Sequence, residues 1–244
     1  MKHLFLAVLL LFSAQVARSG HIGAEVQSAN YDPVKGITTI QIVNTSHKEI
    51  SAINLSIRVT FLDGTMSAPG ANESGIDFVE GIIQGKGGFA PGAIYTQEFP
   101  GQAGPVQATV DMVAYSDGTA DVLNERAFET LIAGRKANAR ARQKINELVT
   151  EALADPAEQN PSAIIAAKLR SLVAAVEQQK ITEEGAGSYE LTLKGAIQDF
   201  DNKARFSTGR SESEDNSLRA YIDMNNQHIP MLIRHSQLVK AVQP

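Results

Sequence analysis

Residues 134–144 form the densest cluster of like charge in the chain. The cluster has no acidic residue and five basic ones: Arg135, Lys136, Arg140, Arg142 and Lys144. Guanidinium and ammonium groups bind carboxylates and phosphates, so these five residues are a candidate partner-binding face. On a helical wheel Lys136, Arg140 and Lys144 fall opposite the apolar residues, which favours a face exposed to solvent. The alternatives are contact with an acidic glycan, with a lipid headgroup or with the acidic first half of the same chain.

Other patterns that carry catalysis or bind metal are scarce. The sequence has no cysteine and no G-x-S-x-G around a serine, so two common nucleophile patterns are missing. His228 and His235 do not form the H-x-x-x-H pattern of a zinc-binding helix, and Pro230 lies between them. Asp199 and Asp201 match part of a calcium loop, but its glycine and terminal glutamate do not follow. We therefore predict no catalytic residue, no metal site and no cofactor.

The first nineteen residues have the features of a signal peptide. Lys2 and His3 precede an apolar run at 4–12, and small residues at Ala17 and Ser19 suit signal peptidase. We expect cleavage before Gly20. No later apolar run approaches the roughly 20 residues that span a bilayer, so no transmembrane segment is expected in the mature chain. Export without cysteine favours a bacterial protein, periplasmic or secreted.

Acidic residues dominate the first half of the mature chain. Residues 20–121 contain 11 acidic and 4 basic residues, whereas residues 122–244 contain 16 of each. A negatively charged surface repels a phosphate backbone, so we expect no nucleic-acid partner.

Alternating apolar and polar residues indicate strands in the first half. The clearest example runs through Ile53, Leu55, Ile57, Val59 and Phe61, with polar residues between them. This pattern predicts an antiparallel strand with one face packed and the other exposed to water.

A strand followed by an Asp-Gly turn occurs twice, as V-T-F-L-D-G-T at 59–65 and V-A-Y-S-D-G-T at 113–119. Asp-Gly after alternating apolar residues predicts a tight reversal. The strand before the second turn changes its pattern, because Val106, Val110 and Met112 share one parity whereas Val113 and Tyr115 have the other. Either both faces of this strand are covered near its end or a bulge reverses its facing.

Three short sequences carry a resemblance to a known domain: I-V-N-T-S at 42–46, V-T-F-L-D at 59–63, and A-P-G at 90–92 before a strand. Together they are similar to the FxLYD domain, a small immunoglobulin-like sandwich found in bacterial exported proteins. The resemblance covers residues 37–115, and Val59 and Leu62 stand where the FxLYD motif has phenylalanine and tyrosine. It implies a binding or spacer module without catalytic residues.

Three N-x-S/T triplets begin at Asn44, Asn54 and Asn72. Such triplets are glycosylation acceptors in secreted proteins. In a chain rich in asparagine, serine and threonine they also arise by chance, which is the interpretation that we favour. Whether they carry glycans is left open.

Beyond residue 121 the apolar period changes from two to about 3.6, which predicts four helices. The first covers 122–154 unless Gly134 breaks it, and the second begins at Pro161 with Asn160 as its cap. A third follows around Leu193. After a polar interruption at 208–216, Ser217 is expected to cap the last helix, with a kink at Pro230.

The predicted fold class is α+β: an N-terminal antiparallel immunoglobulin-like β-sandwich (20–121) followed by a C-terminal α-helical region of about four helices (122–244). The predicted function is that of a non-catalytic binding or structural protein of the bacterial cell envelope. Its partner is an envelope protein, a glycan or a second copy of itself. The alternative is a hydrolase with a cleft between the sandwich and the helices.

Overall fold

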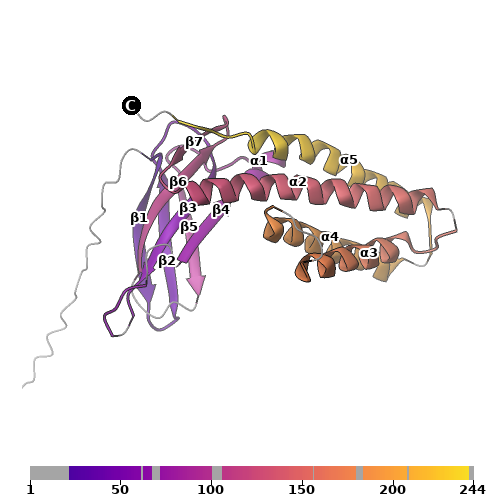
Figure 1. Ribbon diagram of the computed structural model, residues 1–244, viewed down its shortest axis with the longest axis horizontal. Helices are drawn as coiled ribbons and strands as arrows, with labels where there is room; N and C mark the ends of the chain where they lie inside the picture. Colours follow the sequence, from indigo (N-terminus) through magenta and orange to yellow (C-terminus); the bar gives the residue numbers. More distant parts are fainter. Residues whose placement is uncertain are drawn as a thin grey trace, which may run out of the picture.

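The computed structural model describes residues 22–61, 63–67, 72–100, 106–155, 157–179, 184–207 and 209–241. The predicted signal peptide lies outside these residues. A β-sandwich forms one end of the molecule, and a group of helices extends away from it (Figure 1). Strands come first and helices second, so the predicted α+β class is confirmed.

Two sheets form the sandwich. The first has the order β1-β2-β5 and is antiparallel; its strands are β1 (Ala24–Asp32), β2 (Ile37–Asn44) and β5 (Ile94–Pro100). The second has the order β4-β3-β6-β7-β8; its strands are β4 (Asn72–Asp77), β3 (Ile50–Val59), β6 (Val106–Tyr115), β7 (Thr119–Val122) and β8 (Val239–Lys240). The two-residue β8 pairs in parallel with β7, so the end of the helical region returns to the sandwich.

The alternation predicted for β3 places its apolar residues between the two sheets. Ile53 and Leu55 are fully buried there, packed in one cluster with Ile40 and Ile42 of the facing sheet. Phe61 does not join them: it lies beyond the end of β3 and is 44% exposed.

A β-bulge at Asp111 explains the change of pattern in β6. Asn54 of β3 pairs with Met112 whereas the next residue, Leu55, pairs with Val110, so Asp111 is the extra residue. As a result Val110 and Val113 both face the sandwich core, while Met112 faces the helices. Both alternatives considered for this strand are therefore present together.

The outer face of the five-stranded sheet is partly covered. Ala52, Met112 and Ala114 on this face pack against Ala127 and Phe128 at the start of the first long helix. The expectation that β3 has one face exposed to water is therefore wrong at this end of the strand, because a helix covers it.

The two Asp-Gly turns have the same structure, as their sequences predicted. Asp63 Oδ1 accepts hydrogen bonds from the backbone N–H and hydroxyl of Thr65, at 2.9 and 2.7 Å. Asp117 Oδ1 does the same for Thr119, at 2.9 and 2.6 Å. The intervening glycines have φ values of 82° and 90°, in the region that glycine enters without a steric cost.

The described part of the chain contains one short helix between β4 and β5 and four long helices between β7 and β8. The helices are α1 (Val79–Ile83), α2 (Glu125–Ala154), α3 (Pro161–Glu177), α4 (Ala186–Phe206) and α5 (Glu212–His235). At about 1.5 Å per residue the 30 residues of α2 extend about 45 Å from the sandwich. Figure 1 shows α5 along one side of α2, with α3 and α4 along the other.

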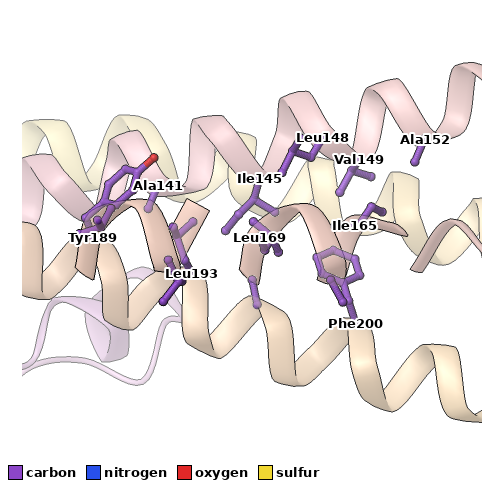
Figure 2. Close-up of a cluster of buried hydrophobic side chains, with 14 of the residues drawn as sticks. Ala141, Ile145, Leu148, Val149, Ala152, Ile165, Leu169, Tyr189, Leu193 and Phe200 are labelled. Atoms are coloured by element: carbon purple, nitrogen blue, oxygen red, sulfur yellow. The ribbon is translucent and has the colours of Figure 1, made fainter. Parts of the chain in front are cut away.

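An apolar cluster joins α2, α3, α4 and the first half of α5 (Figure 2). Ile145 of α2, Leu169 of α3, and Leu193 and Phe200 of α4 are all fully buried in it. Apolar residues that recur about every 3.6 positions lie on one side of a helix. Each helix therefore presents one apolar stripe to the others, and these stripes form the cluster.

Gly134 does not break α2, and it serves close packing instead. A Cβ at this position would lie 2.8 Å from Ser188 Oγ of α4. Gly185, which immediately precedes α4, has φ of 76°, and a Cβ there would lie 2.6 Å from the carbonyl oxygen of Ala133. The two glycines thus allow the start of α4 to approach α2.

The predicted cap of α3 is confirmed, whereas the last helix begins earlier than predicted. Residues 208–216 are not all an interruption and Ser217 is not the cap, because α5 begins at Glu212 and the Ser211 side chain accepts from the Glu214 N–H. Acidic residues fill this first turn, where the helix dipole favours negative charge. The helix continues past Pro230 to its end; a kink at that residue stays a prediction.

Candidate functional site

Arg135 is the residue that joins the helices to the sandwich. Its side chain extends from α2 and is 1% exposed. Nε and Nη2 donate to the two carboxylate oxygens of Asp77 in β4, at 3.0 and 2.8 Å. Nη1 donates to the backbone carbonyl of His235 in α5 at 2.7 Å, and Nη2 also donates to the carbonyl of Ser51 in β3 at 3.1 Å. One guanidinium therefore fixes two strands and two helices relative to one another.

A second ion pair lies beside the first, two helical turns along α2. Arg142 Nη2 donates to Glu80 Oε1 of α1 at 2.8 Å. Its Nη1 donates to Oδ1 of Asn225 in α5 at 3.0 Å, and Asn225, which is fully buried, donates in turn to Asn146 of α2 at 2.9 Å. This polar row sets the register between α2 and α5. Together, Arg135, Asp77, Arg142 and Glu80 are called the junction below.

The five basic residues of the candidate face do not lie on one surface. Arg135 and Arg142 belong to the junction, which is the contact with the acidic half that was considered as an alternative. Lys136 is exposed, Lys144 pairs with Glu147 at 2.7 Å, and Arg140 donates to the carbonyl of Glu184. Partner binding by the basic face as a whole stays a prediction, with Arg135 turned inward.

A notch of about 430 Å³ lies next to the junction. Its sides come from β3 and β4 of the sandwich, from α2, and from the first turns of α4. Asn54 and Gly75 contribute from the sheet, Leu131 from α2, and Leu191 and Thr192 from α4. Leu191 is 73% exposed, so its apolar side chain is available at the rim of the notch.

The notch exists because α2 covers only part of the sheet. Its first turns lie over β6 and β7, which leaves the β4 side of the outer face uncovered. Gly75 has no side chain to fill the space above this part of the sheet. A Cβ there would meet only Asn54, at 3.7 Å, so the space is open. The bulge residue Asp111 helps to place the helix: its carboxylate accepts from Asn124, whose own Oδ1 caps α2 at the Ala127 N–H.

Three carboxylates line the notch, and contacts already occupy each of them. Asp77 and Glu80 are ion-paired to arginine, and Glu73 accepts from Asn124 Nδ2 at 3.3 Å. The residues described as lining it include no histidine, and the described chain has no group of three or more possible ligands for a metal. The alternative of a hydrolase with a cleft between the two parts stays a prediction; two of the three carboxylates, Asp77 and Glu80, are held in ion pairs.

Two histidines face the junction from α5. His228 and His235 are 8% and 6% exposed, and within the described structure Nδ1 of His228 has no hydrogen-bond partner. Burial, aided by the nearby Arg142, lowers the pKa of His228 below its ordinary value of 6.5. Burial and then Arg135 lower the pKa of His235 in the same way. From their spacing in the sequence, these two histidines were considered only as metal ligands. Their position near two arginines could not be seen from the sequence.

An open groove of about 720 Å³ also runs between α2 and α5. Ile222, Ile229 and Pro230 form its apolar part, and Gln143 and Asn146 are among its polar residues. It is wide and shallow.

Two of the three glycosylation triplets are unsuited to modification in the folded protein. Asn44 is 1% exposed and its Nδ2 donates to the carbonyls of Lys48 and Phe89, both at 2.8 Å. Asn54 is 6% exposed and donates to Asp111 at 2.8 Å. These asparagines hold loops and strands together. The side chain of Asn72 lies outside the described residues.

Comparison with known proteins gave no match to any family model, curated protein or solved structure. None of the described helices is long and apolar enough to cross a membrane. The fold and the junction define a mixed α+β protein in which a β-sandwich and a helical region enclose a notch.

Proposed function

We propose that this chain is an exported, non-catalytic binding protein that receives its partner in the notch between the sandwich and the helices. The observation that carries this proposal is the exposed Leu191 on a notch whose sides are joined by the ion pairs of the junction. Binding is tighter when the receiving surface is already in place, because less freedom is lost on association.

The arrangement of polar groups favours binding over hydrolysis. A general acid or base needs a proton-exchanging group within reach of the substrate. Asp77 and Glu80, the two carboxylates nearest the junction arginines, have their oxygens directed at Arg135 and Arg142. Besides Glu73, which accepts from Asn124, the notch offers apolar side chains, amides and hydroxyls, which suit recognition of a protein segment or a sugar.

Export is proposed on the sequence of residues 1–19 and on the absence of cysteine from the chain. The resemblance to the FxLYD domain supports the same compartment. The partner is accordingly an envelope protein, an envelope glycan or a second copy of this chain.

Site-specific crosslinking tests the proposal. A photoreactive amino acid replaces Leu191 in the protein made by its natural host, and the control carries it at Ile164, which is also an exposed apolar residue of the helical region (39% exposed). We expect a defined crosslinked species with the label at 191 and none at 164. A species near twice the mass of the processed chain would identify self-association.

A third variant combines the label at 191 with Gly75→Leu, which fills the notch from the sheet side. If the species forms equally well in this variant, or equally at both labelled positions, the notch is not where the partner binds and the proposal fails.

A further inference from the structure

The junction and the two histidines form a cluster whose charges balance only while the histidines are neutral. Arg135 and Arg142 supply two positive charges, and Asp77 and Glu80 supply two negative ones. His228 and His235 lie against this set, and each is almost fully buried. Each proton that a histidine gained would add a positive charge without adding a new carboxylate to receive it.

The groups that face each histidine come from several elements. His228 faces Arg142 of α2 and Glu80 of α1. His235 faces Arg135 of α2, Arg234 of α5 itself, Asp77 of β4, and Glu49 just before β3.

Most of the opposing carboxylate charge has a partner already. Asp77 and Glu80 bind the two arginines, and the carboxylate of Glu49 accepts from the backbone of Gly88 and the hydroxyl of Ser116, at 2.7 and 2.6 Å. An imidazolium at either position would therefore meet an arginine without a free counter-ion beside it.

The end of α5 packs in a small apolar cluster of its own, in which Ile229 and Leu232 lie with Val79 of α1 and Ala139 of α2. Leu218 in the first half of α5 is fully buried in the helical core. The end of α5 is followed by β8, a two-residue strand with backbone hydrogen bonds from Val239 to Gly118 and from Ala241 to Ala120, at 2.9 and 2.7 Å. For this end to leave the sandwich, the small cluster, the Arg135 bond to the His235 carbonyl and the two β8 bonds must break, while the separate helical core around Leu218 can stay intact.

We propose that the junction is an acid-sensitive latch: protonation of His228 and His235 releases the end of α5, together with β8, from the sandwich while the rest of the helical core stays folded. This device depends only on the junction and does not require that the notch bind a partner.

The direction of the pH effect follows from the lowered pKa values of both histidines. In the latched form each takes up a proton less readily than an imidazole in water, with its ordinary value of 6.5. Below about pH 6.5 the released form therefore binds more protons than the latched form, and falling pH favours release. Above that pH both forms hold neutral histidines and the latch is closed.

Distance measurement between two spin labels tests the latch, and the absence of native cysteine allows labels to be placed freely. One cysteine replaces Val239 in β8, which is 67% exposed, and the other replaces Thr96, an exposed residue of β5. Distances are measured by electron resonance at pH 7.5 and at pH 5. We expect one narrow distribution at pH 7.5 and its loss at pH 5, with the helical circular dichroism signal retained.

Two variants decide whether the histidines are responsible. In His228→Gln/His235→Gln we expect the narrow distribution to persist at pH 5. His47→Gln removes an exposed histidine in the turn before β3, and we expect it to respond to acid as the unaltered protein does. No broadening between pH 7.5 and 5, or equal broadening in both variants, would overturn the proposal.

A magnetic resonance titration of the unaltered protein covers the case in which the double variant does not fold. We expect the ring signals of His228 and His235 to titrate below pH 6.5, over the same range in which the label distance broadens. Titration of both rings at or above 6.5 would refute the latch.

Discussion

Arg135 combines a high degree of burial with a complete set of partners. A buried guanidinium is tolerated when a carboxylate neutralises it and its N–H groups find acceptors, and here Asp77, Ser51 and His235 meet both needs. Removing it would leave the Asp77 carboxylate without its counter-ion and the His235 carbonyl without this donor, whereas the Ser51 carbonyl keeps the N–H of Phe78. Arg135 therefore contributes to the stability of the fold, by holding the helices on the sandwich.

The variant Arg135→Met measures this role. We expect it to lower the free energy of unfolding by about 1–3 kcal/mol, since a buried carbonyl loses its donor and Asp77, which is 34% exposed, loses its counter-ion. Its matched control is Lys136→Met, which removes the neighbouring, exposed basic residue and should change stability by less than about 0.5 kcal/mol. Urea denaturation of both variants gives the answer. If the two variants lose similar amounts of unfolding free energy, Arg135 does not join the helices to the sandwich as described.

The partners of Arg135 could not be read from the sequence. Asp77 is 58 residues away along the chain and His235 is 100 residues away. A helical wheel assigns each residue of a helix to a face, and it correctly placed Lys136 in solvent. It cannot show which face of α2 a sheet will cover, so Arg135 was grouped with its exposed neighbours.

At the scale of elements, the period of apolar residues predicted most of the architecture. It predicted the apolar alternation of β3, the strands before the Asp-Gly turns and the helices beyond residue 121. It did not predict β1, whose residues show no clean alternation between buried and exposed positions, or β8, which is too short to carry a pattern. The start of α5 was missed because its first turn is acidic and polar, which resembles a linker when the dipole that favours it is not considered.

Two glycines of similar appearance in the sequence have opposite roles, one before α4 and one in its middle. Gly185→Ala should destabilise the protein by about 1–3 kcal/mol, because φ of 76° strains alanine and the new Cβ would lie 2.6 Å from a carbonyl oxygen of α2. Gly195→Ala lies in the middle of the helix with open space around it and should stabilise by about 0.5–1 kcal/mol. Thermal unfolding distinguishes the two, and a shared sign would contradict this packing of α4 on α2.

At the scale of the whole molecule, the buried location of the junction determines how the two parts respond to salt. Ion pairs at the surface weaken as the Debye length falls, whereas the junction pairs, with arginine side chains 1% and 14% exposed and carboxylate side chains 34% and 37% exposed, are screened less. The relative placement of sandwich and helices should therefore resist salt and respond to acid instead. The notch, whose sides come from both parts, keeps its shape only while that placement holds.

The distance between the sandwich and the far end of the helices tests most directly whether the junction fixes the two parts. Labels at Thr96 in β5 and at the exposed Gln159, between α2 and α3, report the orientation of one part relative to the other. At neutral pH we predict a single narrow distribution that is unchanged between about 0.1 and 1 M salt and that broadens in Arg135→Met. A broad distribution in the unaltered protein, or one that Arg135→Met leaves narrow, would contradict a junction that holds the molecule together.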